Sequence, residues 1–437
     1  MLIGNSDNDM MKPPISKRPC RRGWKSSPES ALPLPSGGNG SSFIPDEIIF
    51  LEILVLVPVK SLVRFQTVCK SWRATLTSTR FVRRHLELSR STMVVVPRKY
   101  QASRFLNIFS FQPGESKCAE LMVRKEFQPY GIPAFSIPLH CDGLILIPAL
   151  TGTIFICNPA TGEFVELPPG SPSLLHEHRV AFGFDPWSGT YKVARHFIRS
   201  YRDTTTPQID DGEEGGTTTT TREYSCGHEI LTFGGDVGKE EAAWVWKATV
   251  DPPYPIKART PICLPGAFFW SALKSMLLPA KVISNVILRF SLLDETFTVH
   301  PNPPCSDYLG GNDSLSALGE KLCYIHSTSP WDISIWLAED GSNLAWSLCR
   351  RVCLPIPRML LAFACASTDR DKIFISVDAC ILLRCDLRDG SLEEIINMPR
   401  DMLYDLRNGR KINIGALFVA HYTVPYVEPL LRIRPSR

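Results

Sequence analysis

The densest apolar stretch of the chain runs from Ile48 to Val57 and is interrupted mainly by Glu52. A helix on the surface of a domain needs only one apolar stripe, whereas this stretch is apolar on nearly every side. One side is therefore expected to pack against its own neighbours, and another to be covered by a second protein. Pro45 and Asp46 before the stretch are typical of a helix start, and Pro58 ends it and can open the next helix.

The second helical pattern follows Pro58. Apolar residues recur there every three or four positions, which is the spacing of a helix. The residues at that spacing are Leu62, Phe65, Cys69, Trp72 and Leu76. Phe65, Cys69, Trp72 and Leu76 are predicted to pack internally, and some of them can be shared with a partner protein. Such a unit of short helices buries little surface, so it is only marginally stable alone.

The pattern changes completely after Leu88. Short apolar runs alternate with turn residues to the end of the chain, as in a sandwich, barrel or propeller. The predicted strands are 105–111, 143–147, 153–157, 164–167, 191–197, 228–233, 243–250, 286–292, 296–300, 321–326, 333–337, 372–377, 381–386 and 413–419.

One unit recurs in this region: a strand, a tight turn and a second strand ending near proline. The turns are predicted at Ala160-Thr161-Gly162, Trp187-Ser188-Gly189, Asp294-Glu295 and Arg388-Asp389-Gly390. Glycine supplies the positive φ that such hairpin turns require. A hairpin repeated at blade-like intervals favours a β-propeller of six or seven blades.

Composition places the chain among ordinary globular proteins, with 437 residues, 44% hydrophobic residues and a net charge of +4. The charge is too small to indicate nucleic acid. None of the fourteen cysteines forms a CxxC pair. No signal segment and no run of about twenty apolar residues is present, so we expect a nuclear and/or cytoplasmic protein with reduced thiols.

Two polar segments are predicted to lie outside the folded cores. Residues 1–42 form a basic tail expected to be disordered, and its run KRPCRRGWK at 17–25 can be a nuclear import signal or simply a solvated tail. Residues 203–222 are rich in threonine, glycine and acid, and we expect a mobile insertion between strands.

The helical segment resembles an F-box. The matching positions are Pro45, Asp46, Glu52, Ile53, Leu54, Pro58, Lys60, Ser61, Leu62, Arg64, Phe65, Val68, Cys69, Lys70, Ser71, Trp72, Phe81 and His85. Ile44 and Val55 depart from the pattern, but both are apolar. The resemblance implies a small all-α domain of three helices, residues 43–89, that binds a Skp-type adaptor. The expected adaptor contacts are Ile44, Pro45, Ile48, Ile49, Leu51, Pro58, Leu62 and Val63.

The remainder, residues 90–437, resembles the F-box-associated domain of plant-type F-box proteins. The resemblance rests on three motifs: HCDGL at 140–144, NPATG at 158–162 with Leu167-Pro168, and FGFDP at 182–186 with YKV at 191–193. It implies a large all-β, propeller-like module that binds a target. Tryptophans in this region are predicted to be core residues between blades, with one or two on a recognition surface.

Catalytic chemistry finds no support in the sequence. A P-loop, GxGxxG, GxSxG and HExxH are all absent. His176 and His178 flank Glu177, but a metal site there would lack its other ligands. Asp185, Asp294, Asp386 and Asp389 fall at hairpin turns, where aspartate caps its own backbone. We therefore expect no enzyme, no cofactor, and no catalytic or metal-binding residue.

The resemblance thus implies a substrate-recognition subunit of an SCF-type ubiquitin ligase. Its partners would be a Skp-type adaptor, through it a cullin–RING core, and an unknown target protein, with no membrane and no nucleic acid. Two alternatives remain: an adaptor-bound scaffold that delivers nothing for degradation, and a glycan-recognising propeller.

Overall fold

The computed structural model describes residues 48–99, 105–127, 137–149, 152–174, 179–207, 218–234, 244–256, 261–278, 281–305, 313–339, 344–360, 362–367, 371–415 and 419–433. The chain divides into two units, Met1–Pro45 and Asp46–Arg437, and all described residues belong to the second. The tail, including its basic run at 17–25, lies outside the described residues.

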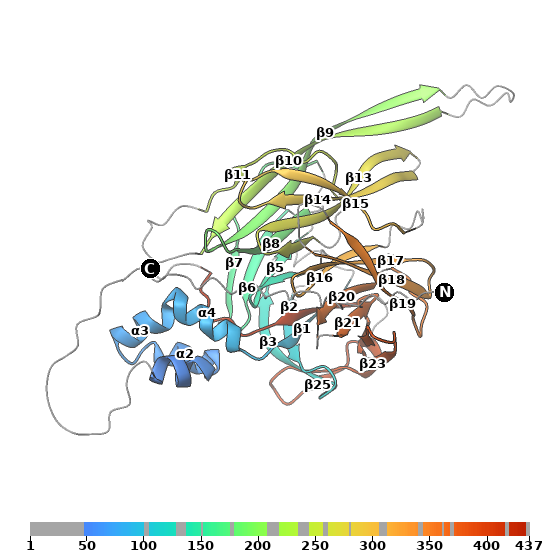
Figure 1. The fold of residues 1–437 in the computed structure, drawn as a ribbon. Coiled ribbons are helices and arrows are strands. Elements are labelled where there is room, and N and C mark those ends of the chain that lie inside the picture. The colour runs from blue at the N-terminus through green and yellow to red at the C-terminus, as the bar shows by residue number, and fades with distance from the viewer. Residues whose placement is uncertain are drawn as a thin grey trace, which may run out of the picture. The chain divides into compact units, whose positions relative to one another are not determined.

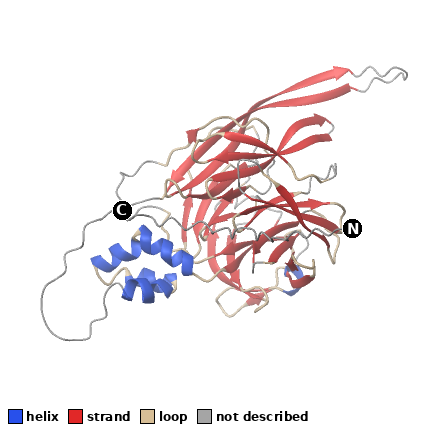
Figure 2. Ribbon diagram, viewed as in Figure 1, coloured by secondary structure: helices blue, strands red, loops and turns tan. Residues whose placement is uncertain are grey.

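The helices of residues 49–88 form one group beside the strands (Figure 2). A π-helical turn, η1 (Ile49–Ile53), and a 3-10 turn, η2 (Leu54–Leu56), precede α2 (Val59–Phe65), α3 (Lys70–Thr77) and α4 (Thr79–Leu88). Pro58 is extended, with ψ 144°, and opens α2 as predicted. Among the described residues, the only other helix is the short α5 (Met398–Asp401).

The predicted second helix is divided. The chain turns after α2, and Cys69 starts α3 by accepting a hydrogen bond on Sγ from the backbone N–H of Trp72 at 3.4 Å. Cys69 was expected to pack internally, but it is exposed. The prediction was wrong because helical spacing does not reveal a break at which the side chain serves as a cap.

The rest of the unit is built mainly from antiparallel strands (Figure 1). In chain order they are β1 (Thr92–Lys99), β2 (Phe105–Phe111), β3 (Cys118–Glu126), β4 (Leu139–Cys141), β5 (Leu144–Pro148), β6 (Ile154–Asn158), β7 (Glu163–Glu166), β8 (Arg179–Asp185), β9 (Thr190–Pro207), β10 (Thr218–Phe233), β11 (Lys247–Ala248), β12 (Ile262–Leu264), β13 (Ala267–Leu278), β14 (Lys281–Ser291), β15 (Phe297–Pro301), β16 (Ser314–Leu318), β17 (Lys321–Ser327), β18 (Asp332–Glu339), β19 (Trp346–Cys353), β20 (Ala362–Ser367), β21 (Lys372–Val377), β22 (Ile381–Asp386), β23 (Leu392–Asn397), β24 (Leu403–Asp405), β25 (Lys411–Ile412) and β26 (Val419–Tyr426).

These strands form a β-propeller of six blades, as the hairpin repeat predicted. Five sheets are present, and the eight-stranded one consists of two four-stranded blades, β8–β11 and β12–β15. They are joined where β10 pairs with β13 at Thr220–Leu278 and Thr221–Leu277. The first strands of successive blades, β26, β4, β8, β12, β16 and β20, contact one another in a closed ring.

The ring closes through the end of the chain. β26 pairs antiparallel with β1, from Thr92 opposite Tyr426 to Lys99 opposite Val419, and so supplies the first strand of the first blade. β24 extends the outer edge of the same blade by pairing in parallel with β3. The propeller is therefore complete only when residues 419–426 are in place.

The predicted hairpin turns are confirmed by the pairing of β6 with β7, β8 with β9, β14 with β15 and β22 with β23. Gly162, Gly189 and Gly390 have φ of 74°, 67° and 81°, and Glu295 takes the same region at 53°. The side chains of Asp185, Asp386 and Asp389 accept backbone N–H groups two residues on, as expected. Asp294 instead exchanges hydrogen bonds with the Ser291 hydroxyl.

Strand positions agree with prediction where a short apolar run lies between turn residues; the bounds of β2, β21 and β22 are those predicted. The predicted strand 413–419 is wrong, because β25 ends at Ile412 and β26 begins at Val419. β19 was not predicted, since its sequence WSLCRRVC carries two charges. The long hairpin of β9 and β10 continues to Pro207 and resumes at Thr218, so strand covers part of the predicted 203–222 insertion (Figure 1).

Seven clusters of buried apolar residues fill the described structure, and those of the β region lie within or between blades. Trp270 is the bulkiest fully buried side chain, 1% exposed. Trp187 and Trp331, at 71% and 47%, lie on the surface instead. The thirteen described cysteines are all free thiols. None of the described helices is long and apolar enough to cross a membrane.

Candidate functional site

The helical end exposes an unusual number of large apolar side chains. Of the predicted adaptor contacts, Ile48 is 45% and Val63 38% exposed, and Pro58 is also exposed. Ile49 and Leu51 are half-buried, whereas Ile44 and Pro45 lie outside the described residues. Three further exposed residues were not predicted as contacts: Ile53 at 48%, Leu56 at 68% and Val68 at 59%.

Leu62 requires a correction. We expected it to contact a partner, but it is fully buried, at 0% exposure, in the core beneath the helices. Leu76 and Phe81 lie in the same core, and Trp72 packs edge-on against Phe50 with ring centroids 5.4 Å apart. The helical spacing correctly identified an apolar face, but it could not show whether residues of this chain or of a partner bury that face.

The core beneath the helices is not made by the helices alone. Ala160, from the turn between β6 and β7, and Leu430, after β26, are 9% and 4% exposed and belong to the same buried cluster. The helical region and the propeller therefore share one apolar contact.

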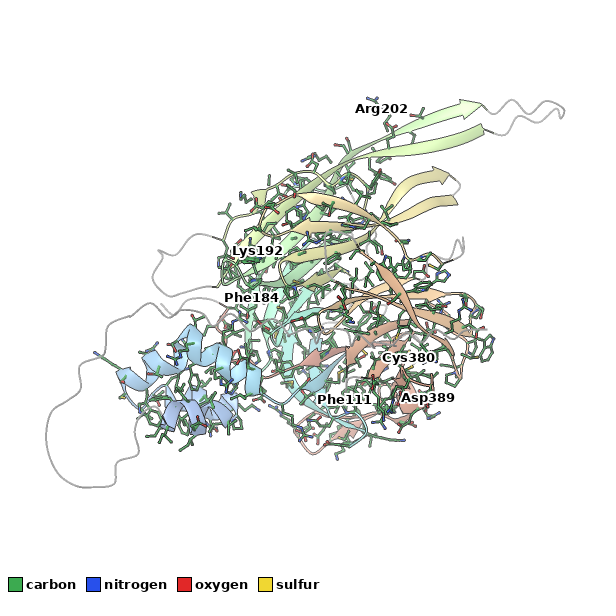
Figure 3. All side chains as sticks on the ribbon, viewed as in Figure 1. Phe111, Phe184, Lys192, Arg202, Cys380 and Asp389 are labelled. Atoms are coloured by element: carbon green, nitrogen blue, oxygen red, sulfur yellow. The ribbon has the colours of Figure 1, made fainter. Side chains whose placement is uncertain are left out.

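An arginine on α4 fastens the helices to the propeller. Arg83 Nη1 donates to Asp142 Oδ2 at 2.5 Å, and its guanidinium lies 3.4 Å from the centroid of the Phe184 ring. Tyr191 Oη donates to the same Asp142 oxygen at 2.8 Å. Burial, and then the nearby Asp142 carboxylate, raises the pKa of Tyr191, so the hydroxyl stays protonated and keeps donating. Phe184 is labelled in Figure 3.

The last described residues lie between the two regions. Glu428 Oε2 accepts from the backbone N–H of Val59 at 3.2 Å, and Arg432 Nη2 donates to Gln66 Oε1 at 2.7 Å. Asn158 Nδ2 donates to the carbonyls of Pro429 and Leu431 at 3.1 and 2.7 Å. This segment thus binds α2 on one side and β6 on the other.

The three motifs that carry the propeller resemblance meet at this junction. Asp142 and Gly143 belong to the first, Asn158 to the second, and Phe184 to the third. Gly143 has φ +80°, and a Cβ there would lie 2.0 Å from the Val427 carbonyl oxygen. Sequence reasoning singled these residues out as signatures but did not find this contact, because their partners are up to 273 positions away.

A second group of exposed apolar side chains lies on loops at the opposite end of the blades from the helices. The helices contact turns that join the first to second, or third to fourth, strands of blades. Trp331 and Met359 instead follow second and fourth strands, β17 and β19, which end at the opposite end of an antiparallel blade. Trp331 is 47%, Met359 84% and Leu360 45% exposed.

This second group is held firmly. The buried Arg358 guanidinium donates to the carbonyls of Ser329 and Leu360 at 3.2 and 3.1 Å. The carboxylate of Asp378 accepts both backbone N–H groups of Met359 and Leu360 at 2.7 Å. The exposed side chains are therefore presented by ordered backbone.

Metal-ligating side chains do not cluster in the part of the chain that the structure describes: no group of three His, Cys, Asp or Glu residues there could hold an ion. His176, Glu177 and His178 lie outside that part.

Comparison with known families gives two matches. Residues 42–84 match the model of the F-box domain, and residues 93–384, more than half of the chain, match that of the F-box associated beta propeller domain.

Three curated proteins of Arabidopsis thaliana are similar to the chain. An F-box/kelch-repeat protein is 24% identical over 313 residues, covering 70% of this chain and 65% of its own length. An F-box protein is 27% identical over 374 residues, covering 77% and 70%. An F-box/WD-40 repeat-containing protein is 25% identical over 328 residues, covering 74% and 72%. The match therefore spans just under two thirds of the first relative's length and somewhat more of the other two.

Proposed function

Since the chain belongs to the F-box proteins with an F-box associated β-propeller domain, we propose that it is the substrate-recognition subunit of an SCF-type ubiquitin ligase. In this role the F-box binds a Skp-type adaptor, through it a cullin–RING core, and the propeller binds a target protein. The division into a tail (1–42), an F-box (43–89) and a propeller (90–437) is part of the proposal, as is action in the nucleus or cytoplasm.

The exposed apolar side chains of the F-box carry this proposal. Ile48, Ile53, Leu56 and Val63 lie within a segment that already contributes a buried core on its other side. Large apolar side chains exposed together mark an interaction surface. We assign the adaptor contact to Ile44, Pro45, Ile48, Ile49, Leu51, Pro58 and Val63, and we add Ile53 and Leu56. Leu62 belongs to the core instead.

Binding of a purified Skp-type adaptor tests this assignment. Val63→Asp places an unpaired charge in an apolar contact, which costs several kcal/mol, so we expect affinity to fall at least about a hundredfold. Val299→Asp is the matched control, because Val299 lies on β15 of the propeller and is 44% exposed against 38% for Val63. Equal affinity of the two variants would contradict the assignment.

No bond is made or broken by this chain in the proposed role. It holds a target near a charged conjugating enzyme and so raises the local concentration of the target's lysines. We propose that the target contacts the patch formed by Trp331, Met359 and Leu360. These side chains are exposed, the backbone of Met359 and Leu360 is held by Asp378, and their connections lie opposite to those that meet the F-box.

Target capture can be tested in cells with the proteasome inhibited. Proteins that copurify with the wild type and with Val299→Asp, but not with Met359→Asp, are the expected targets. A copurifying set unchanged by Met359→Asp would contradict the patch. Captured proteins whose abundance does not rise when the chain is removed would favour a scaffold over a degradation receptor.

A further inference from the structure

The segment that follows the last propeller strand contacts both the F-box and the propeller. Residues Val427–Ile433, here called the C-terminal segment, leave β26 and reach the helices of the F-box (Figure 1). Leu430 is 4% and Ile433 1% exposed. Because these side chains are buried, the segment is part of the packed structure.

Side chains of the propeller bind the backbone of the C-terminal segment on one side. Asn158, itself 0% exposed, donates to the Pro429 and Leu431 carbonyls, and Glu163 Oε2 accepts from the N–H of Ile433 at 3.0 Å. Its start is fixed by β26, which must pair with β1 to close the ring. The position of the segment therefore depends on a closed propeller.

The F-box contacts the other side of the C-terminal segment through both ends of α2. α2 has seven residues, and Pro58 at its N-cap offers no capping side chain. Glu428 accepts from Val59, the first residue of α2, in place of a cap. Arg432 donates to Gln66, the C-cap residue. A carboxylate at the N-terminus of a helix satisfies a free N–H and the helix dipole.

A helix of this length is not stable by itself in water. α2 is held by burial of Leu62 against a core that includes Leu430, and by the two polar contacts at its ends. It also carries Val63, one of the exposed residues assigned to the adaptor contact.

We propose that Glu428 and Arg432 are positioning residues for the F-box. Through them the C-terminal segment fixes α2, so that the adaptor-binding surface forms only after β26 has closed the propeller. An incomplete or unclosed receptor is then a poor adaptor ligand. The statement about the adaptor rests on the proposed function, whereas the statement about α2 does not.

Hydrogen exchange of the full chain tests the contact with α2. Loss of a capping contact costs about 1 kcal/mol, so Glu428→Ala should raise the exchange rate of α2 amides about fivefold. Amides of the blades should exchange as in the wild type, which a general loss of stability would not allow. Glu428→Gln keeps an acceptor oxygen and should restore most of the protection. Glu393→Ala, which removes an exposed partner of Arg384 in blade β20–β23, should change nothing in α2.

Adaptor affinity tests the consequence. A chain ending at Tyr426 keeps β26 but lacks the segment, and we expect at least tenfold weaker binding of a purified Skp-type adaptor, with blade amides still protected. Where the shortened chain does not fold, the double variant Glu428→Ala, Arg432→Ala in the full chain replaces it, with a smaller loss expected.

Two results would overturn the proposal: unchanged α2 exchange in Glu428→Ala, or full adaptor affinity of the folded shortened chain. A wild-type chain that binds no adaptor would instead defeat the proposed function, while the exchange of α2 would still decide the positioning role.

Discussion

The F-box and the propeller solve the burial of apolar surface in different ways. Among the described residues, six of eighteen exposed large apolar side chains fall within residues 48–88: Ile48, Ile53, Leu56, Val63, Val68 and Leu88. The propeller has a closed ring of blades and spreads the other twelve over residues 174–403. The F-box core also includes Ala160 and Leu430 from the propeller. The F-box therefore depends on the propeller to complete its core and leaves apolar surface exposed on another side, whereas the blades of the propeller cover one another in a closed ring.

The largest loss of unfolding free energy is expected for a substitution in the core of the propeller. Trp270 is fully buried and packs against Phe268, Phe297 and His228. Trp270→Ala leaves a cavity and should cost about 4 kcal/mol of unfolding free energy. Chemical denaturation followed by circular dichroism measures this. A loss below about 1 kcal/mol would show that the blades do not pack as described.

The next largest loss of stability is expected for Leu62→Ala in the F-box core. The expected cost is about 3 kcal/mol, because the fully buried side chain leaves a cavity. We expect faster amide exchange throughout α2 to α4 and weaker adaptor binding, with blade amides unchanged. Blade amides that lose protection equally would mean that the two regions unfold together.

The wild type and a variant at the buried His196 should differ in how much stability they lose in acid. His196 is 2% exposed, and burial, followed by Arg179 and His228, lowers its pKa to about 3. The unfolded chain takes up a proton below about pH 6.5, but folded His196 does not until about pH 3, so stability falls as the pH drops through this window. The slope is about 1.4 kcal/mol per pH unit, or about 2 kcal/mol between pH 6.5 and 5.

His196→Gln should remove that part of the acid sensitivity. Denaturation midpoints at pH 7 and pH 5 measure it for the wild type and the variant. If both lose the same stability, His196 titrates normally in the folded propeller and the account of its burial is wrong.

The smallest effect concerns the contact between the two regions. Arg83 and Asp142 are 28% and 30% exposed, and the charged hydrogen bond should contribute about 1 kcal/mol of coupling in a double-mutant cycle of Arg83→Gln and Asp142→Asn. Exchange of α4 amides reports it. Additive effects of the two substitutions would show that the F-box is held by its apolar contact alone.

Prediction from the sequence succeeded where a local pattern determines the structure. Pro58 opens α2, glycines mark the hairpins, and short apolar runs between turn residues give β21 and β22 their bounds. The family resemblance located the F-box and the propeller. These features depend on neighbours in the chain, which periodicity and turn chemistry report directly.

Prediction failed where distant segments meet. Leu62 looks like any apolar position of a helix, and only the fold shows that it is buried in a core completed by Leu430. Trp270 and Trp331 are alike in sequence, yet one is buried and the other is exposed. The contacts of Asn158 with Pro429 and Leu431 span 271 and 273 positions and have no local signal.

Calorimetric titration of the full chain with a purified Skp-type adaptor measures whether the exposed apolar surface of the F-box binds the adaptor. Burial of the apolar F-box surface predicts a complex of one chain with one adaptor and a clearly negative heat-capacity change on binding. Absence of binding heat at every temperature, together with separate elution of the two proteins, would contradict it.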